Sequence, residues 1–233
     1  MGFMKPISDD IWIIDGEEVS WYGMPYTTRT TVVKLKTGEL WIHSPGKTSE
    51  ELLKEIEGHG PVGYLVSPNK IHHLFLTEWK NKYPAASLYA SPGLREKRRD
   101  VEFDKDLGDF PEKEWSDEVD QIIFKGSSAM EEIVFFHKNS KTLILTDLIE
   151  NFHPDHFSGY KKVIARVTGI VSPKGKTPLD WRMTFMLGKK EARSCLEKII
   201  SWHPSNIIIS HGECIFEGAE EFLKKSFRWL GRA

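Results

Sequence analysis

Residues 62–73 read VGYLVSPNKIHH. The apolar start of this stretch, residues 62–66, predicts a buried strand. Pro68 breaks regular structure directly afterwards, so a polar loop follows the strand. Loops at the carboxyl ends of buried strands project their side chains into a common cleft. The stretch therefore predicts part of an α/β fold in which His72 and His73 face a functional site.

The elements before this stretch are marked by short apolar runs and by turn residues. Gly38 lies between two runs rich in Thr, Val and Ile, which predicts a hairpin because glycine adopts the positive φ of such turns. Ser49 precedes two glutamates, a pattern typical of a helix start. The predicted elements are strands at Ile11–Ile14, Arg29–Leu35 and Glu39–His43, and a helix after Ser49 that Gly58 and Gly60 end.

The elements after the loop follow from the same signals. Their order predicts a helix at Leu74–Tyr83, a strand at Ser87–Ala90, strands at Gln121–Phe124, Ile133–Phe136 and Thr142–Leu145, a helix at Lys189–Trp202, a strand at Asn206–Ser210 and a helix at Glu217–Leu230. Two segments do not fit this pattern. The charged segment Arg95–Trp115 is expected to be a surface excursion, and Phe152–Asp180, rich in Pro and Gly, is expected to be irregular.

The order strands, hairpin, helix, strand and helix occurs roughly twice along the chain. Continuous apolar strands such as residues 207–209 must be covered on both faces. The sequence thus predicts a single domain, residues 1–233, built as a four-layer αββα sandwich of two mixed β-sheets flanked by helices. An ordinary doubly wound fold is the structural alternative.

The composition excludes several classes of protein. The 233 residues carry a formal net charge of -2, which gives no general attraction for nucleic acid or an anionic membrane. The first ten residues do not resemble a signal peptide, and no apolar run is long enough to cross a bilayer. The presence of only two cysteines argues against a disulfide framework. We therefore expect a cytoplasmic protein with a small-molecule substrate and no nucleic-acid or membrane partner; the oligomeric state stays open.

Three predicted strands end in residues that can bind a metal ion. His72 and His73 follow the first, Asp147 follows the second and His211 follows the third. Imidazole and carboxylate groups are ligands of zinc, iron and manganese. Taken singly, each has a simpler interpretation: a hydrogen-bonded pair at a helix start for His72 and His73, a cap for Asp147 and a buried ring for His211. Together they predict a metal site.

Other polar residues carry weaker signals. Glu132 is a candidate for orienting a ligand, whereas His137 fits the polar end of a strand. His43, at the end of another strand, is a further candidate for the cleft. His153 and His156 flank Pro154 and Asp155 and have the spacing of a metal site, but no strand aims them, so a polar loop is the better interpretation.

Several ordered motifs give the chain its resemblance to a known family. They are Arg29–Leu35, Gly38–Pro45, Pro68–His73, Glu132–His137, Thr146–Leu148 and His211-Gly212. On these motifs the sequence resembles the metallo-β-lactamase superfamily over nearly its whole length, and within it a branch defined as a domain of unknown function. The resemblance implies the αββα sandwich and metal ligands after successive strands.

The resemblance also shows where this chain departs from the superfamily. Pro68 and Lys70 stand where the first two histidines of the superfamily loop belong, His72 replaces its aspartate, and His73 matches its last histidine. No histidine is present near Gly126, where the third ligand of the first metal site belongs. The resemblance thus implies one divalent ion, zinc or iron, with manganese as a further option, bound by His72, His73, Asp147 and His211.

The implied function is a mononuclear metal-dependent hydrolase of a small ester, thioester or phosphate-containing substrate. Asp147 and Lys70 are the candidate catalytic residues, since Lys70 would place a positive charge in the vacated first site. One alternative is a binding or scaffold protein whose catalysis decayed with the lost ligands. A second alternative is an iron-dependent redox protein.

Overall fold

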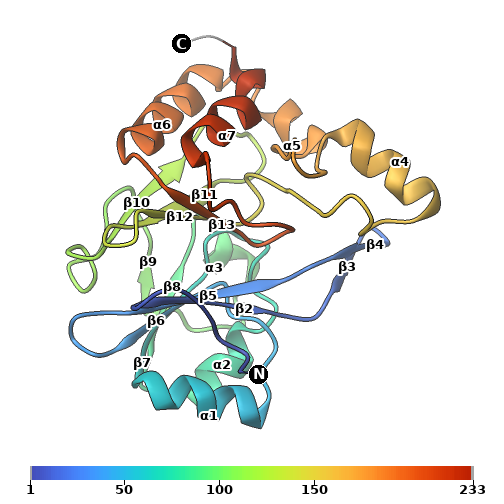
Figure 1. The fold of residues 1–233 in the computed structure, drawn as a ribbon. Helices are drawn as coiled ribbons and strands as arrows, with labels where there is room; N and C mark the ends of the chain where they lie inside the picture. Colours follow the sequence, from blue (N-terminus) through green and yellow to red (C-terminus); the bar gives the residue numbers. More distant parts are fainter. Residues whose placement is uncertain (1, 232–233) are drawn as a thin grey trace.

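Two mixed sheets lie face to face, and helices cover the outer side of each (Figure 1). The computed structural model describes residues 2–231; the ends of the predicted domain, residue 1 and residues 232–233, lie outside this range. The layers confirm the αββα sandwich, and the presence of two stacked sheets rules out the doubly wound alternative.

The first sheet holds seven strands in the order β1-β2-β5-β6-β7-β8-β9. Their bounds are β1 Lys5–Ser8, β2 Ile11–Asp15, β5 Arg29–Lys34, β6 Leu40–His43, β7 Val62–Val66, β8 Ser87–Ala90 and β9 Lys105–Asp106. Pairing is antiparallel as far as β6 and parallel from β6 onward. The outer face carries α1 (Glu50–His59) and α2 (Leu76–Lys82), and α3 (Leu94–Lys97) follows β8.

The second sheet has the order β10-β11-β12-β13. Its strands are β10 Val119–Phe124, β11 Glu132–His137, β12 Thr142–Leu145 and β13 Asn206–Ile209. β12 and β13 run parallel, with Leu145 opposite Ile209. The helices of this half are α4 Gly159–Thr168, α5 Leu179–Thr184, α6 Lys189–Ser201 and α7 Ala219–Ser226, followed by a 3₁₀ turn at Arg228–Leu230.

Three apolar layers hold the sandwich together. One fills the space between the two sheets and includes Trp41, Trp115 and Phe135, all of which are buried. The other two lie between each sheet and its own helices. Burial of such large side chains stabilises each layer by roughly 1.5–3 kcal/mol per residue. The strand ends are therefore firmly placed where the polar loops begin.

The segment Arg95–Trp115 differs from the surface excursion that its charge predicts. Phe103, Leu107 and Trp115 are buried, and residues 105–106 add an edge strand to the first sheet. The expectation was wrong because widely spaced apolar residues here pack inward while the charged ones between them stay in water. Trp115 Nε1 also donates to Gln121 Oε1 at 3.2 Å, which satisfies its buried indole.

The segment Phe152–Asp180 also holds more structure than expected. Residues 159–168 form α4, which ends at Gly169 in the left-handed conformation with φ 80°. A two-stranded hairpin, β3 (Val19–Trp21) and β4 (Met24–Tyr26), lies beside it and was not predicted either.

Across residues 2–231, no helix is long and apolar enough to span a membrane.

Candidate metal centre

Three strand ends from the two sheets converge on one point. β7 of the first sheet leads into the loop that carries His72, whereas Asp147 and His211 follow β12 and β13 of the second. Because Leu145 pairs with Ile209 in parallel register, Asp147 and His211 lie at equivalent positions, each two residues beyond the paired strands. The topology therefore brings these three side chains together.

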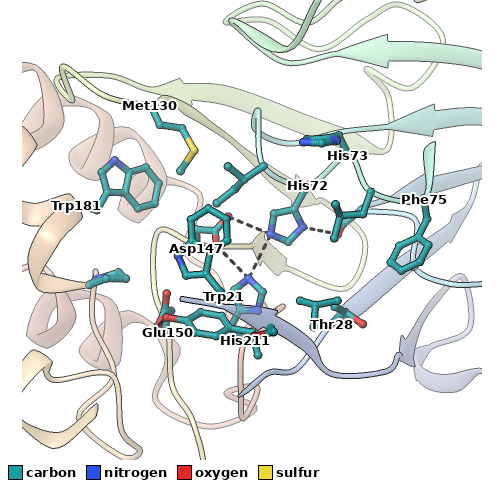
Figure 2. A pocket seen from close by; sticks show the side chains of 18 of the residues that line it. Trp21, Thr28, His72, His73, Phe75, Met130, Asp147, Glu150, Trp181 and His211 are labelled. Atoms are coloured by element: carbon teal, nitrogen blue, oxygen red, sulfur yellow. Dashed lines mark hydrogen bonds and ion pairs between the residues drawn. The ribbon is translucent and has the colours of Figure 1, made fainter. Parts of the chain in front are cut away.

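The three side chains make close polar contacts (Figure 2). His72 Nε2 lies 3.0 Å from Asp147 Oδ2, and His211 Nε2 lies 3.0 Å from Asp147 Oδ1. The two Nε2 atoms are 3.3 Å apart. Asp147 and His211 are almost fully buried, and His72 is partly so. Their donor atoms all lie within 4.8 Å of one another, and we call these three residues the triad.

Hydrogen bonds behind the rings orient their Nε2 atoms. His211 Nδ1 is 2.6 Å from the carbonyl oxygen of Thr27, which can only accept, so Nδ1 carries the hydrogen. His72 Nδ1 is 2.6 Å from Ser44 Oγ, a hydroxyl that can accept a hydrogen in the same way. In neutral rings this leaves both Nε2 lone pairs facing Asp147, as in histidines that bind metals.

The donor set fits a divalent ion. Ligand bonds of about 2.0–2.1 Å in a tetrahedral site put neighbouring donor atoms about 3.3 Å apart, close to the 3.0 to 3.3 Å found here. Two nitrogen lone pairs and a carboxylate repel one another unless a cation or proton lies between them. Burial acts against the charged form of Asp147, but the charges and hydrogen bonds of His72 and His211 lower its pKa well below the usual range.

The same interactions act on His211. Burial alone would lower its pKa, but the hydrogen bond and charge of Asp147 outweigh burial and raise it. Asp147 is thus held as a carboxylate that attracts positive charge, whether a proton on the imidazole or a metal ion. The triad therefore has the electrostatics of a cation site.

Asn69 connects the loop of the first sheet to the ligand loop of the second. Its Nδ2 donates to Asp147 Oδ2 at 2.6 Å and to Glu132 Oε2 at 3.2 Å, while its Oδ1 accepts from the backbone N–H of Ile71 and His72. Glu132 in turn accepts the backbone N–H groups of residues 146, 147 and 148. The sequence suggested that Glu132 orients a ligand, and in the structure Glu132 fixes the backbone of the loop that carries Asp147.

Two predicted site residues lie outside the triad. His73 Nδ1 is 3.0 Å from Arg98 Nη1, and its ring lies apart from the triad although it lines the same pocket. Burial, together with the charges of Lys97 and Arg98, lowers the pKa of His73 to about 4. Lys70 donates through Nζ to the carbonyl oxygen of Ala129 and is not among the residues that line the pocket. The structure therefore brings together three of the five predicted residues.

Within residues 2–231, the remaining histidine candidates make no hydrogen bond or ion pair with the triad. His43 is buried and stacks on Trp41. His137 bonds to Ser140 at the far end of β11. His153 accepts the backbone N–H of Asp155, and His156 donates to the carbonyl oxygen of Pro25. The last two belong to a polar loop, as expected.

A pocket of about 550 Å³ opens over the triad. The triad lies at its floor, together with Glu150, and its walls are mainly apolar, with Trp21, Phe75, Met130 and Trp181 among them. Burial raises the pKa of Glu150 to about 8, and Tyr26 donates to its Oε2 at 3.1 Å. The floor is thus polar and titratable while the walls suit an apolar group.

Several residues of this site were not predicted from the sequence. Ser44 and Asn69 lie within the motifs Gly38–Pro45 and Pro68–His73. Their positions next to His43 and Pro68 could have indicated that they belong to the site. Thr27, Tyr26 and Glu150 lie in segments without any such pattern. They reach the site through tertiary contacts: Tyr26 and Glu150 line the pocket, and the carbonyl oxygen of Thr27 accepts from His211.

Comparison with solved structures identifies the fold as that of the metallo-β-lactamases. A metallo-β-lactamase from Pontibacter korlensis superposes with a TM-score of 0.64 at 13% identity, covering 99% of each chain. FIM-1 from Pseudomonas aeruginosa in its mono-zinc form gives a TM-score of 0.65 at 10% identity, covering 97% of this chain and 93% of that one. The metal-soaked Flv1 flavodiiron core from Synechocystis gives 0.64 at 13% identity, covering 97% and 60%.

Within this fold the chain belongs to the family described as a domain of unknown function, DUF4336, whose model matches residues 8–158. The matched region includes His72 and Asp147 but ends before His211. A search of curated proteins finds no significant match.

Proposed function

We propose that the protein is a mononuclear metal-dependent hydrolase of a small ester or thioester with a largely apolar acyl group. The observation that carries this proposal is the convergence of His72, Asp147 and His211 at the floor of a pocket with apolar walls. Three protein ligands beneath an open pocket are typical of catalytic rather than structural metal sites.

The proposed ligands are the triad residues alone. A divalent ion held by them would act as a Lewis acid on an acyl carbonyl oxygen at the floor of the pocket. Thr27 and Ser44 fix the orientation of the two imidazoles, and Asn69 fixes that of the carboxylate. His73 and Lys70 have no ligand role in this proposal.

Glu150 lies outside the triad and is a group of this pocket that can hold and release a proton. Its carboxyl lines the floor, and Tyr26 fixes one of its oxygens. With a pKa of about 8 it is largely protonated at neutral pH, so it can donate a proton to a leaving alkoxide or thiolate. Water would form the new bond to the acyl carbon as the bond to the leaving group breaks, and its proton would restore the carboxyl of Glu150. The apolar walls would bind the acyl chain.

The lining of the pocket favours an uncharged substrate over a phosphate. Its walls are mainly apolar, and of the lysines that the structure describes only Lys97 lines it. On these walls the charged oxygens of a phosphate would lose their hydration without gaining enough polar partners. We therefore propose the ester or thioester in preference to the phosphate-containing substrate.

Iron-dependent redox chemistry is the second candidate. It is favoured by the donor set, since two histidines and one carboxylate are the ligands of many non-haem iron(II) sites. The fold likeness to a flavodiiron core is consistent with it but concerns a protein only 13% identical.

Hydrolysis of nitrophenyl esters of graded acyl length, by protein reconstituted with zinc, manganese or iron, tests the proposal. We expect activity that rises with acyl length and is abolished in Asp147→Asn. The matched control, His73→Ala, should retain it. A protein that is inactive with all three metals would contradict the hydrolase proposal. Equal loss of activity in Asp147→Asn and His73→Ala would also contradict it. A protein that is active only with iron and consumes oxygen would favour the redox candidate.

A further inference from the structure

Helix α4 turns its apolar side away from the protein. Tyr160, Val163, Ile164 and Val167 have the spacing of one helix face, and between 45% and 73% of each is exposed. Ala165, on the opposite side, is buried. A surface helix normally buries its apolar stripe against the core, so this arrangement is reversed.

The exposed apolar surface continues beyond α4. Within residues 2–231, eight of the fourteen large exposed hydrophobic side chains lie in residues 160–187, and Trp21 and Tyr22 of the hairpin add two more. Lys161 Nζ donates to the carbonyl oxygen of Gly23 at the hairpin tip, and Arg182 of α5 donates to that of Thr168. The hairpin tip, α4 and α5 are therefore linked side by side, and we call them the apolar rim (Figure 1).

The apolar rim is also strongly basic. Its two helices, α4 and α5, carry four Lys and Arg against one Asp, a formal charge of +3. The wider segment, residues 159–190, contains eight Lys and Arg against one Asp, a formal charge of +7, in a chain whose total is -2. The rest of the chain therefore carries -9. On α4, Lys161 and Arg166 fall on either side of the apolar stripe at helical spacing. The overall charge predicted no attraction to an anionic membrane because it sums a basic segment and an acidic remainder.

We propose that the apolar rim docks the protein on the surface of an anionic lipid bilayer. Apolar and aromatic side chains bordered by lysine and arginine are the pattern of helices that lie in a membrane interface. Tyr22, Trp21 and Tyr160 are the aromatic types that favour the headgroup region. A symmetric contact between two copies would instead place one net-positive surface against another, which is unfavourable.

The docked orientation would bring the pocket close to the membrane. Trp21 and Thr184 belong to the apolar rim and also line the pocket, and Trp181 of α5 does the same. The inference does not depend on the proposed hydrolase activity, because it rests on surface residues outside the triad.

Sedimentation with lipid vesicles tests the proposal. We expect the full chain to bind vesicles of phosphatidylcholine mixed with phosphatidylserine, to bind pure phosphatidylcholine far more weakly, and to dissociate at high salt. Val163→Asp combined with Val167→Asp should abolish binding. Arg166→Ala should weaken it about fivefold, since each cation near the surface contributes about that factor.

Phe110→Asp is the matched control, because Phe110 is 82% exposed but lies outside the apolar rim. It should bind like the wild type, and all variants should keep the wild-type thermal transition. Absence of binding to anionic vesicles would overturn the proposal, as would equal loss in Phe110→Asp. A third possible result is that the wild type forms a dimer and binds no vesicles, while the double variant at Val163 and Val167 is a monomer. That result would overturn the proposal and assign the surface to self-association.

Discussion

Asn69 is the residue on which the geometry of the triad depends most. Its amide contacts Thr146 and Asp147 of the loop after β12, Glu132 at the start of β11, and two backbone N–H groups of its own loop. A buried amide with all its groups satisfied fixes both partners, whereas its removal leaves several buried polar groups without a partner.

We expect Asn69→Ala to destabilise the fold and weaken metal binding. The unfolding free energy should fall by about 1–3 kcal/mol, and metal affinity by about 10–100-fold, as for other partners of metal ligands. Denaturant titration and a competing chelator measure the two effects. Asn139→Ala, at an exposed asparagine bonded to Asp10, is the control and should change neither.

Glu150 should affect turnover rather than metal binding. Glu150→Gln keeps the shape of the side chain and the acceptor for Tyr26 but cannot release a proton. We expect kcat on ester substrates to fall by about 10²–10⁴-fold, the usual contribution of a general acid or base, with unchanged metal content. Asp180→Asn, at an exposed carboxylate of the same pocket, should leave kcat almost unaltered. Equal rates for wild type and Glu150→Gln would refute the acid role.

For the pair His72 and His73, the sequence could not predict which histidine reaches the triad. Sequence predicted that both His72 and His73 face the site, because a loop removes the divergence that neighbouring helical residues have. In the structure only His72 reaches the triad, since Asn69 binds its backbone N–H and Ser44 its ring, whereas Arg98 binds His73. Those partners come from distant segments, so local sequence could not separate the two.

At the level of elements, the loop after β13 is shaped by close backbone contact. Gly212 has φ 109°, and a Cβ atom there would lie 2.2 Å from the carbonyl oxygen of Asn151. Asn151 pairs with His211 and Glu213 through backbone hydrogen bonds of 2.9 and 2.8 Å. The absence of a side chain at Gly212 thus allows the loop that carries His211 to pack against the loop after Asp147.

Gly212→Ala should therefore disturb both fold and site. We expect a loss of at least about 1–3 kcal/mol in unfolding free energy, from a strained backbone conformation alone, with reduced metal content. Gly108→Ala, where an added Cβ meets no atom within 4 Å, is the control for a simple glycine replacement. Thermal unfolding followed by circular dichroism compares them; equal transitions would show that the close contact is unimportant.

Elements with a strong local pattern were predicted well, and those defined by tertiary contacts were not. β7 and β8 have the predicted bounds because apolar runs and turn residues mark both ends. α4 was missed because its apolar stripe is short and lies between segments rich in Pro and Gly. The burial of Trp115 was missed because the charged residues around it indicate a surface, and its partners lie on other strands.

At the scale of the whole molecule, the triad joins the two sheets. His72 lies on the loop after β7 of the first sheet, whereas Asp147 and His211 follow β12 and β13 of the second. An ion that binds the folded chain but not the unfolded chain stabilises it, by about 2.7 kcal/mol at a hundred times its dissociation constant. We expect added zinc or iron to raise the thermal transition of metal-free protein, and to leave that of Asp147→Asn unchanged. Calorimetry with and without metal makes this comparison.

Elemental analysis of tag-free protein, after reconstitution and removal of loose metal, measures whether the triad binds a single ion. We predict one equivalent of a divalent ion per chain in the wild type and in His73→Ala, and almost none in His211→Ala or Asp147→Asn. A wild type that binds no metal while keeping its fold would contradict the account. So would two equivalents per chain, or loss of the metal in His73→Ala but not in His211→Ala.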